Sequence, residues 1–288
     1  MPAMWAEIQQ LVSRFPGKVG IWLESLHSHE HYAHNPDWKV LAASTIKLPM
    51  LCYALSTGTD LRQAVRVKPE TVAGGSGVLK ELSLVKGHPA PGDAGTHGLS
   101  LPLLDLLTLM IVVSDNTATN VVLDYFGHKE PFNAYYRAQG WHNTYSAGML
   151  SLPDDRPDPR RLKGEASTVS AEDLGLLLKR LWHGELLSPE ATQTALSILS
   201  KQQMTFFLRY LPADLDDLEE GKAPFRLYSK SGEIRQCRHD AGILAKDNLA
   251  YSLVVLTETE VDPRFHPDHP AVLLIGKIAS VLYQHRLS

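Results

Sequence analysis

The chain has 288 residues, of which 44% are hydrophobic and 21% charged; this composition is typical of a globular protein and excludes a disordered, collagenous or coiled-coil chain. Its 28 Lys and Arg against 32 Asp and Glu give a net charge of −4, which provides no basic field for nucleic acid or an anionic membrane. No apolar run reaches the roughly 18 residues of a membrane span, and the first residues show no signal-peptide pattern. From the sequence as it stands we expect a soluble, cytoplasmic protein.

The hydrophobic pattern predicts strands near both ends of the chain. Residues 3–15 are predicted to form a helix, and residues 18–26 a strand whose hairpin partner lies within 31–40. Near the C-terminus the alternation predicts three antiparallel strands, over 225–230, 234–246 and 249–258. A closing helix is predicted over 271–285. We therefore expect an α/β (α+β) fold with an antiparallel five-stranded sheet, built from both chain ends and flanked by the terminal helices.

The middle of the chain is predicted to be mainly helical, with helices over 44–55, 101–113, 116–126, 170–182 and 189–200. Ser170 is placed to cap its helix, and Asp173 stands where a capping box carries its acid. Residues 146–167 are rich in proline and charge and are predicted to form a long loop of functional importance. We expect a sheet domain formed by residues 1–40 plus 180–288. Residues 41–179 are expected to form a mainly helical domain that contains this loop.

The first candidate catalytic motif is Ser44-Thr-Ile-Lys47, at the start of a predicted helix. This spacing puts both side chains on one helical face, and a lysine whose pKa is lowered by burial or by a neighbouring cation can activate a serine nucleophile. Backbone N–H groups at the helix start can stabilise an oxyanion. About one S-x-x-K is expected by chance in a chain of this length. The second copy, Ser83 to Lys86, runs into glycine and prolines, and we interpret it as a coincidence.

The second motif is Ser114-Asp115-Asn116, which interrupts an apolar stretch. It could be a turn between helices in which Asn or Asp acts as a cap. In the functional interpretation, the Ser114 hydroxyl shuttles a proton and the Asn116 amide orients a substrate.

The third motif is Lys230-Ser231-Gly232, at the end of a predicted strand. It could be an exposed strand end. Alternatively, it lies on an edge strand whose lysine and hydroxyl bind a substrate carboxylate, while Gly232 lets the substrate approach the backbone closely.

Together and in this order, the three motifs resemble those of the penicillin-recognising serine hydrolases, the class A β-lactamases and penicillin-binding proteins. The segment GGSGVLKEL at 74–82 resembles the one that these proteins carry between the first two motifs. The resemblance implies a sheet domain and a helical domain with the active site at their junction, as in the β-lactamase/transpeptidase fold. It also implies that no metal or cofactor is needed.

The resemblance further implies covalent catalysis, in which Ser44 attacks a β-lactam or another acyl carbonyl and Lys47 acts as the base. The backbone N–H groups of Ser44 and Glu233 would form the oxyanion hole. The remaining groups that protonate the leaving group or bind the substrate would be Ser114, Asn116, Lys230, Ser231 and Gly232. The expected partner is a small, carboxylate-bearing acyl compound.

The sequence departs from the class A pattern in three ways. Ser231 replaces the usual threonine but keeps the hydroxyl. The long loop has no recognisable E-x-x-x-N arrangement for activating water, which leaves Asp154 and Asp155 as candidate bases. Glu165 is expected instead to hold the loop by pairing with Arg160 or Arg161. Finally, family members are usually exported, and no export signal is visible.

Three functions therefore remain open. The leading hypothesis is a β-lactamase-like serine hydrolase. The alternatives are a penicillin-binding or sensor protein that is acylated without efficient turnover, and a cytoplasmic esterase or amidase.

Two further features are interpreted as non-catalytic. A cluster of histidines could share a strand face and hold a metal, but it is expected in a solvated hairpin turn; it comprises His27, His29, His31 and His34. Cys52 and Cys237 are too few for a disulfide scaffold, and Cys52 is expected to be a buried, inert thiol.

Overall fold

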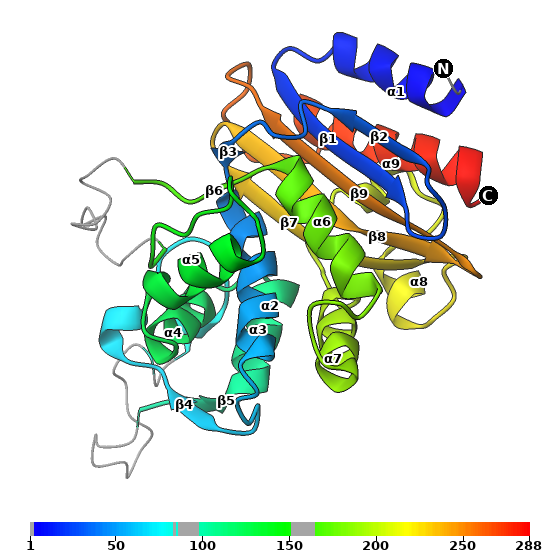
Figure 1. The fold of residues 1–288 in the computed structure, drawn as a ribbon. Coiled ribbons are helices and arrows are strands. Elements are labelled where there is room, and N and C mark those ends of the chain that lie inside the picture. The colour runs from blue at the N-terminus through cyan, green and yellow to red at the C-terminus, as the bar shows by residue number, and fades with distance from the viewer. Residues whose placement is uncertain (1–2, 83–84, 86–97, 151–164) are drawn as a thin grey trace.

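A five-stranded antiparallel sheet forms one half of the molecule, and a group of helices packs beside it (Figure 1). The structure, a computed structural model, describes residues 3–82, 85, 98–150 and 165–288. The sheet has the strand order β2-β1-β9-β8-β7, with β1 (Lys18–Ser25), β2 (His31–His34), β7 (Arg226–Ile234), β8 (Cys237–Lys246) and β9 (Leu249–Glu258). The predicted fold class is thereby confirmed: both ends of the chain contribute to a single antiparallel sheet.

The two faces of the sheet are covered by different helices. The terminal helices α1 (Ala3–Ser13) and α9 (Pro270–Arg286) cover one face, and α6 (Ala171–Trp182) crosses the other (Figure 1). The central strand β9 is buried on both sides because its side chains alternate between two cores. Leu253 packs with the terminal helices, whereas Val254 packs on the side of the helical region.

The helical region contains α2 (Lys47–Ser56), α3 (Leu103–Val112), α4 (Asn116–Tyr125), α5 (Lys129–Ala138) and α7 (Pro189–Leu199), and the short α8 (Leu215–Glu219) lies beyond it in the chain. Two small strand pairs border these helices: β3 (Val40–Leu41) with β6 (Thr168–Val169), and β4 (Ala64–Arg66) with β5 (Ser100–Pro102). The helix predicted from residue 101 therefore starts later, because its first residues pair with β4.

Strand β7 is longer than the sequence predicts. It pairs with β8 all the way to Ile234 opposite Cys237, so the hairpin turn is at 235–236. The prediction that Lys230-Ser231-Gly232 ends a strand and that the next strand begins at 234 is therefore wrong. The motif is inside a strand, and that strand is the edge of the sheet.

The capping prediction for α6 is half right. The Ser170 hydroxyl accepts the N–H of Asp173 at 3.2 Å, as expected for an N-cap. The Asp173 carboxylate does not complete a capping box; it accepts the Asn143 N–H at 2.9 Å and the Thr144 hydroxyl at 2.8 Å. Asp173 thus ties α6 to the chain that follows α5.

Both cysteines are buried free thiols, as expected for Cys52. In the described part of the chain, no group of three or more His, Cys, Asp or Glu side chains is placed to hold a metal ion. His31 instead packs its ring against Trp22, with centroids 4.1 Å apart. No helix among the described residues combines the length and the apolar character that crossing a membrane requires.

Candidate active site

Ser44 lies on a 3-10 turn (Ala43–Ile46) that leads into α2. Ala43, just before it, has a left-handed backbone conformation with φ of 46°. Ser44 lines two adjoining cavities of about 310 and 640 Å³. The smaller cavity is lined by Ser44, Ser76, Ser114, Met204, Thr205, Phe206, Ser231, Gly232, Glu233 and Phe265. All three sequence motifs therefore contribute to one site.

Lys47 lies beneath this site and is completely buried. Its Nζ contacts the backbone oxygen of Ser114 at 2.7 Å, the Ser114 hydroxyl at 3.1 Å and Oδ1 of Asn116 at 2.8 Å. Burial, and next the positive charge of Lys230, hold the pKa of Lys47 well below its usual value. A buried amine that loses its proton more easily than usual is suited to act as a general base.

The turn Ser114-Asp115-Asn116 both caps a helix and places polar side chains beside Lys47. Asp115 caps α4 by accepting the Ala118 N–H at 2.8 Å, as the structural interpretation expected. Ser114 has a left-handed backbone conformation, with φ of 54°, and its side chain faces Lys47 together with that of Asn116. The cap therefore places the two polar groups that the functional interpretation requires.

The segment 74–82 is held against this turn. The second carboxylate oxygen of Asp115 accepts two backbone N–H groups of the segment, at 2.6 and 2.9 Å, from Val78 and Leu79. The Asn116 amide donates to the backbone oxygen of Gly74 at 2.9 Å. These contacts bring Ser76 to the wall of both cavities.

Lys230 is a second completely buried lysine. Its Nζ donates to the backbone oxygen of Ser231 at 2.8 Å. Burial lowers the pKa of Lys230 to about 7, and the negative charge of Asp240 acts in the opposite direction. Asp240 is itself buried, and its carboxylate holds the neighbouring wall by accepting from the Thr205 hydroxyl and the Phe206 N–H, both at 2.7 Å.

Gly232 brings the edge strand against the turn that carries Ser44. A Cβ on Gly232 would lie 2.9 Å from the backbone nitrogens of Ser44 and Thr45 and 3.1 Å from the Cβ of Ala43. Only a residue without a side chain fits at this point without displacing the turn. Gly232 thus lets two backbone segments of the protein approach each other, and its expected role toward a substrate stays a prediction.

Glu233 and Phe265 are among the side chains at the site that were not anticipated from the sequence. Glu233, which was considered only for its backbone N–H, lines both cavities, and its carboxylate forms an ion pair with Arg238 at 2.5 Å. Burial raises the pKa of Glu233, while Arg238 opposes the shift. Phe265 is 63% exposed and also lines both cavities. A phenylalanine in a segment rich in proline and charge is the only sequence signal that could have pointed to it.

The structure describes one of the three acids that the sequence places near the long loop, Glu165, and not the other two. Asp154 and Asp155 lie outside the described residues, as do Arg160, Arg161 and most of the second S-x-x-K. Glu165 lines the larger cavity. Its carboxylate accepts from Lys129 Nζ at 2.5 Å and from the Tyr145 hydroxyl at 2.9 Å.

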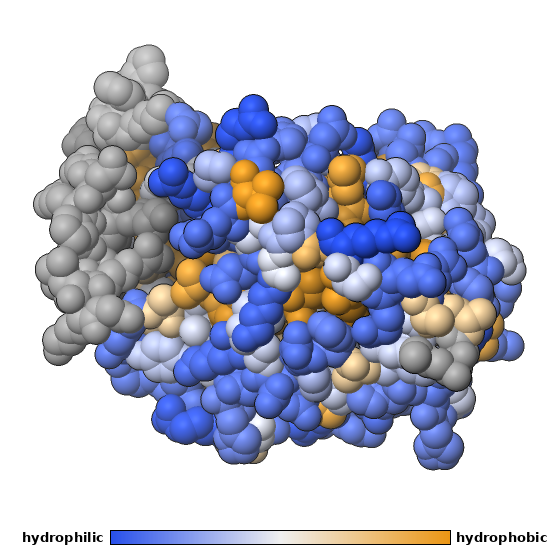
Figure 2. Space-filling model, turned by 90° about the horizontal axis from the view of Figure 1, so that it is seen from above, coloured by the Kyte–Doolittle hydropathy of each residue, from blue (hydrophilic) through white to orange (hydrophobic). Residues whose placement is uncertain are grey.

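The surface seen from above in Figure 1 is mostly hydrophilic (Figure 2). Hydrophobic side chains are visible on it in separate groups, between polar ones and in hollows.

Comparison with known proteins gives one consistent result. A family model described as the β-lactamase enzyme family matches residues 3–286. A β-lactamase of Rhodobacter capsulatus is 22% identical over 282 residues, which cover 96% of this chain and 86% of that protein.

Solved structures with the same fold agree. A β-lactamase from Sphaerobacter thermophilus is 26% identical, with a TM-score of 0.78 and coverage of 98% of this chain and 97% of that one. A mutant of PBP-A, solved as an acyl-enzyme complex with penicillin G, is 25% identical, with a TM-score of 0.76 and coverage of 98% and 95%.

Proposed function

Because the chain belongs to the β-lactamase enzyme family, we propose that it is a serine β-lactamase-like hydrolase in which a β-lactam, or a related amide or ester, acylates Ser44. One observation carries this proposal. The buried amine of Lys47, with its lowered pKa, lies three residues after Ser44 and contacts Ser114 and Asn116. An unactivated serine is a poor nucleophile, and this amine is the base that it requires.

In the proposed acylation step, neutral Lys47 accepts the proton of Ser44 as Oγ bonds to the acyl carbon. The carbonyl electron pair moves to oxygen, where the backbone N–H groups of Ser44 and Glu233 stabilise it. The oxyanion then collapses and the bond to the leaving nitrogen or oxygen breaks. The Ser114 hydroxyl, 3.1 Å from Lys47 Nζ, gives its proton to the leaving atom and is reprotonated by Lys47.

The substrate is proposed to lie between the two walls of the cavity. Asn116 orients it on the side of α4, and the edge strand contacts it through Ser231 and the backbone of Gly232. Lys230 is proposed to act through its charge. That charge lowers the pKa of Lys47, and it favours the negative charge that develops on the substrate during acylation. No metal or cofactor takes part in these steps.

Deacylation requires an activated water, for which Asp154 and Asp155 remain the proposed bases. One observation favours the alternative, a penicillin-binding or sensor role without efficient turnover. Among the described residues that line the cavities, the carboxylates are those of Glu165 and Glu233, and both are engaged by cations. An engaged carboxylate is a weaker base for water.

The test is the intact mass of the protein over time with a penicillin, a chromogenic cephalosporin and a nitrophenyl ester. A mass increase at Ser44, absent in Ser44→Ala and retained in Ser56→Ala, supports the proposal; Ser56 is an exposed serine at the end of α2. A lasting adduct indicates the sensor role, and turnover indicates a hydrolase. Turnover restricted to the ester indicates an esterase. An adduct or turnover that persists in Ser44→Ala would refute the assignment.

A further inference from the structure

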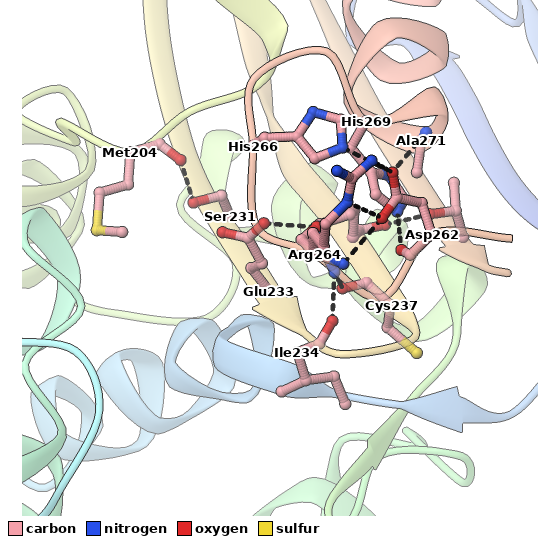
Figure 3. Close-up of polar contacts among 12 residues, drawn as sticks. Met204, Ser231, Glu233, Ile234, Cys237, Asp262, Arg264, His266, His269 and Ala271 are labelled. Atoms are coloured by element: carbon pink, nitrogen blue, oxygen red, sulfur yellow. Dashed lines mark hydrogen bonds and ion pairs between the residues drawn. The ribbon is translucent and has the colours of Figure 1, made fainter. Parts of the chain in front are cut away.

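The edge strand β7 presents two side chains to the cavity beside Ser44. Ser231 and Glu233 are two residues apart on the strand, so they lie on the same face of the sheet. Both line the smaller cavity, and Figure 3 shows them next to each other. The resemblance to the β-lactamase family implies that this wall binds the carboxylate of the substrate.

Two polar groups of this wall already donate to backbone oxygens. The Ser231 hydroxyl donates its proton to the backbone oxygen of Met204 (Figure 3), so its lone pairs remain for the cavity. The buried Lys230 ammonium donates to the backbone oxygen of Ser231. A hydroxyl whose proton is already used offers an acceptor, and a substrate carboxylate needs donors.

Glu233 adds a negative charge at the same place. Its partner Arg238 is completely buried and donates to three backbone oxygens, those of Ile234, Cys237 and Arg264. The guanidinium also lies under the ring of Phe265, 4.7 Å from its centroid. Arg238 is therefore fixed behind the wall, and the carboxylate is the member of the pair that lines the cavity, with its side chain 26% exposed.

The charges around the site support the same conclusion. Glu233 is the only charged residue among the described residues that line the smaller cavity. The larger cavity carries Glu165, Glu233 and Arg235, so its charges partly offset one another. Glu233 is therefore the charged group that an anion beside Ser231 meets at the cavity surface, whereas its partner Arg238 and the cation of Lys230 are buried behind the wall.

We propose that Glu233 is a specificity-determining residue, which favours acyl substrates that present an uncharged or hydrogen-bond-donating group to Ser231 and disfavours those that present a carboxylate there. Like charges brought together at a binding site give selectivity by repulsion. This inference rests on the proposed acylation of Ser44, and it adds the substrate class: neutral or cationic esters and amides.

Penicillin G and its methyl ester provide the test, because they differ only in the carboxylate. The rate of acylation is measured with the full chain, as adduct formation by intact mass or, where no adduct lasts, as turnover, and it is divided by each compound's rate of reaction with hydroxide. The ester is expected to acylate the native protein faster than the acid. In Glu233→Gln, whose amide oxygen can still accept from Arg238, the ester-to-acid ratio should fall by about tenfold. Glu190→Gln, which removes the same charge from the exposed start of α7, should keep the native ratio.

The outcomes separate the two proposals. Adducts with both compounds and a ratio unchanged in Glu233→Gln would overturn the role of Glu233 and leave the acylation of Ser44 standing. A native protein that reacts faster with the acid than with the ester would also overturn the role of Glu233, even if Glu233→Gln failed to fold. The acylation of Ser44 would again stand. If neither compound gives an adduct or is turned over, the proposed acylation by β-lactams is wrong, and the proposed selectivity is wrong with it.

Discussion

Replacing Gly232 by alanine tests whether the edge strand positions the nucleophile. The added Cβ would lie 2.9 Å from the backbone nitrogens of Ser44 and Thr45, whereas ordinary contacts begin at 3.4 Å. Since both contacts are with backbone, the strand and the turn must separate by about 0.5 Å, the difference between these distances. The displacement falls on the atoms that are proposed to attack the substrate and stabilise the oxyanion.

The expected effect is larger on catalysis than on folding. Overpacking of this kind costs about 1–3 kcal/mol of stability. A misplacement of about 1 Å can reduce a rate about 100-fold, and loss of one oxyanion donor has a similar effect, so we expect acylation to slow by about 10- to 100-fold.

The assay is the second-order rate of adduct formation on protein shown by circular dichroism to be folded. Gly20→Ala is the matched control. Its Cβ would be crowded at 3.3 Å by the backbone oxygen of Asn35, but on β1, away from Ser44. Gly20→Ala should acylate at the native rate. A folded Gly232→Ala with native acylation would refute the idea that this close approach positions Ser44.

Two further predictions concern titration. Since only the neutral amine of Lys47 accepts a proton, the rate of acylation should rise as pH rises through the pKa of Lys47. Lys47→Met should slow acylation at least about 100-fold and abolish this pH dependence. If the variant keeps the pH dependence, another group causes it. His239 accepts the Thr257 N–H through Nδ1, and burial lowers its pKa to about 4. The unfolded chain therefore binds the proton first, and stability should fall as pH falls from about 6.5 to about 4, by about 3 kcal/mol in total. Urea unfolding should show this loss in the native protein and a correspondingly smaller one in His239→Gln; equal losses would contradict it.

The sheet was predictable because its strands follow a simple pattern. Alternation of side chains marked β9, and the apolar stretches at the two chain ends marked β1 and the terminal helices. Helix α5 was missed because few large apolar residues mark its packed side, namely Phe132, Tyr135 and Tyr136, and because a proline lies in its first turn. The sequence pattern also could not show that Leu101 pairs with β4 before α3 begins.

The site was predictable where motifs carried it. The resemblance of the motifs to a known family implied that Lys47, Ser114 and Asn116 belong to one site, and the structure brings these three side chains together. The pair of Glu233 with Arg238 was missed for a physical reason. The two residues face each other across the β7–β8 hairpin, and a predicted strand start at 234 gives the hairpin the wrong register.

Burying two lysines has a consequence for any attempt to engineer the protein. Lys47 and Lys230 are completely buried, and burial is the main cause that lowers the pKa of each, which means that the fold opposes their charge. Selection for heat resistance alone would therefore tend to replace these positions with apolar residues of similar volume, and it would discard the proposed chemistry while improving the fold. A library screened for stability should for this reason keep both lysines fixed.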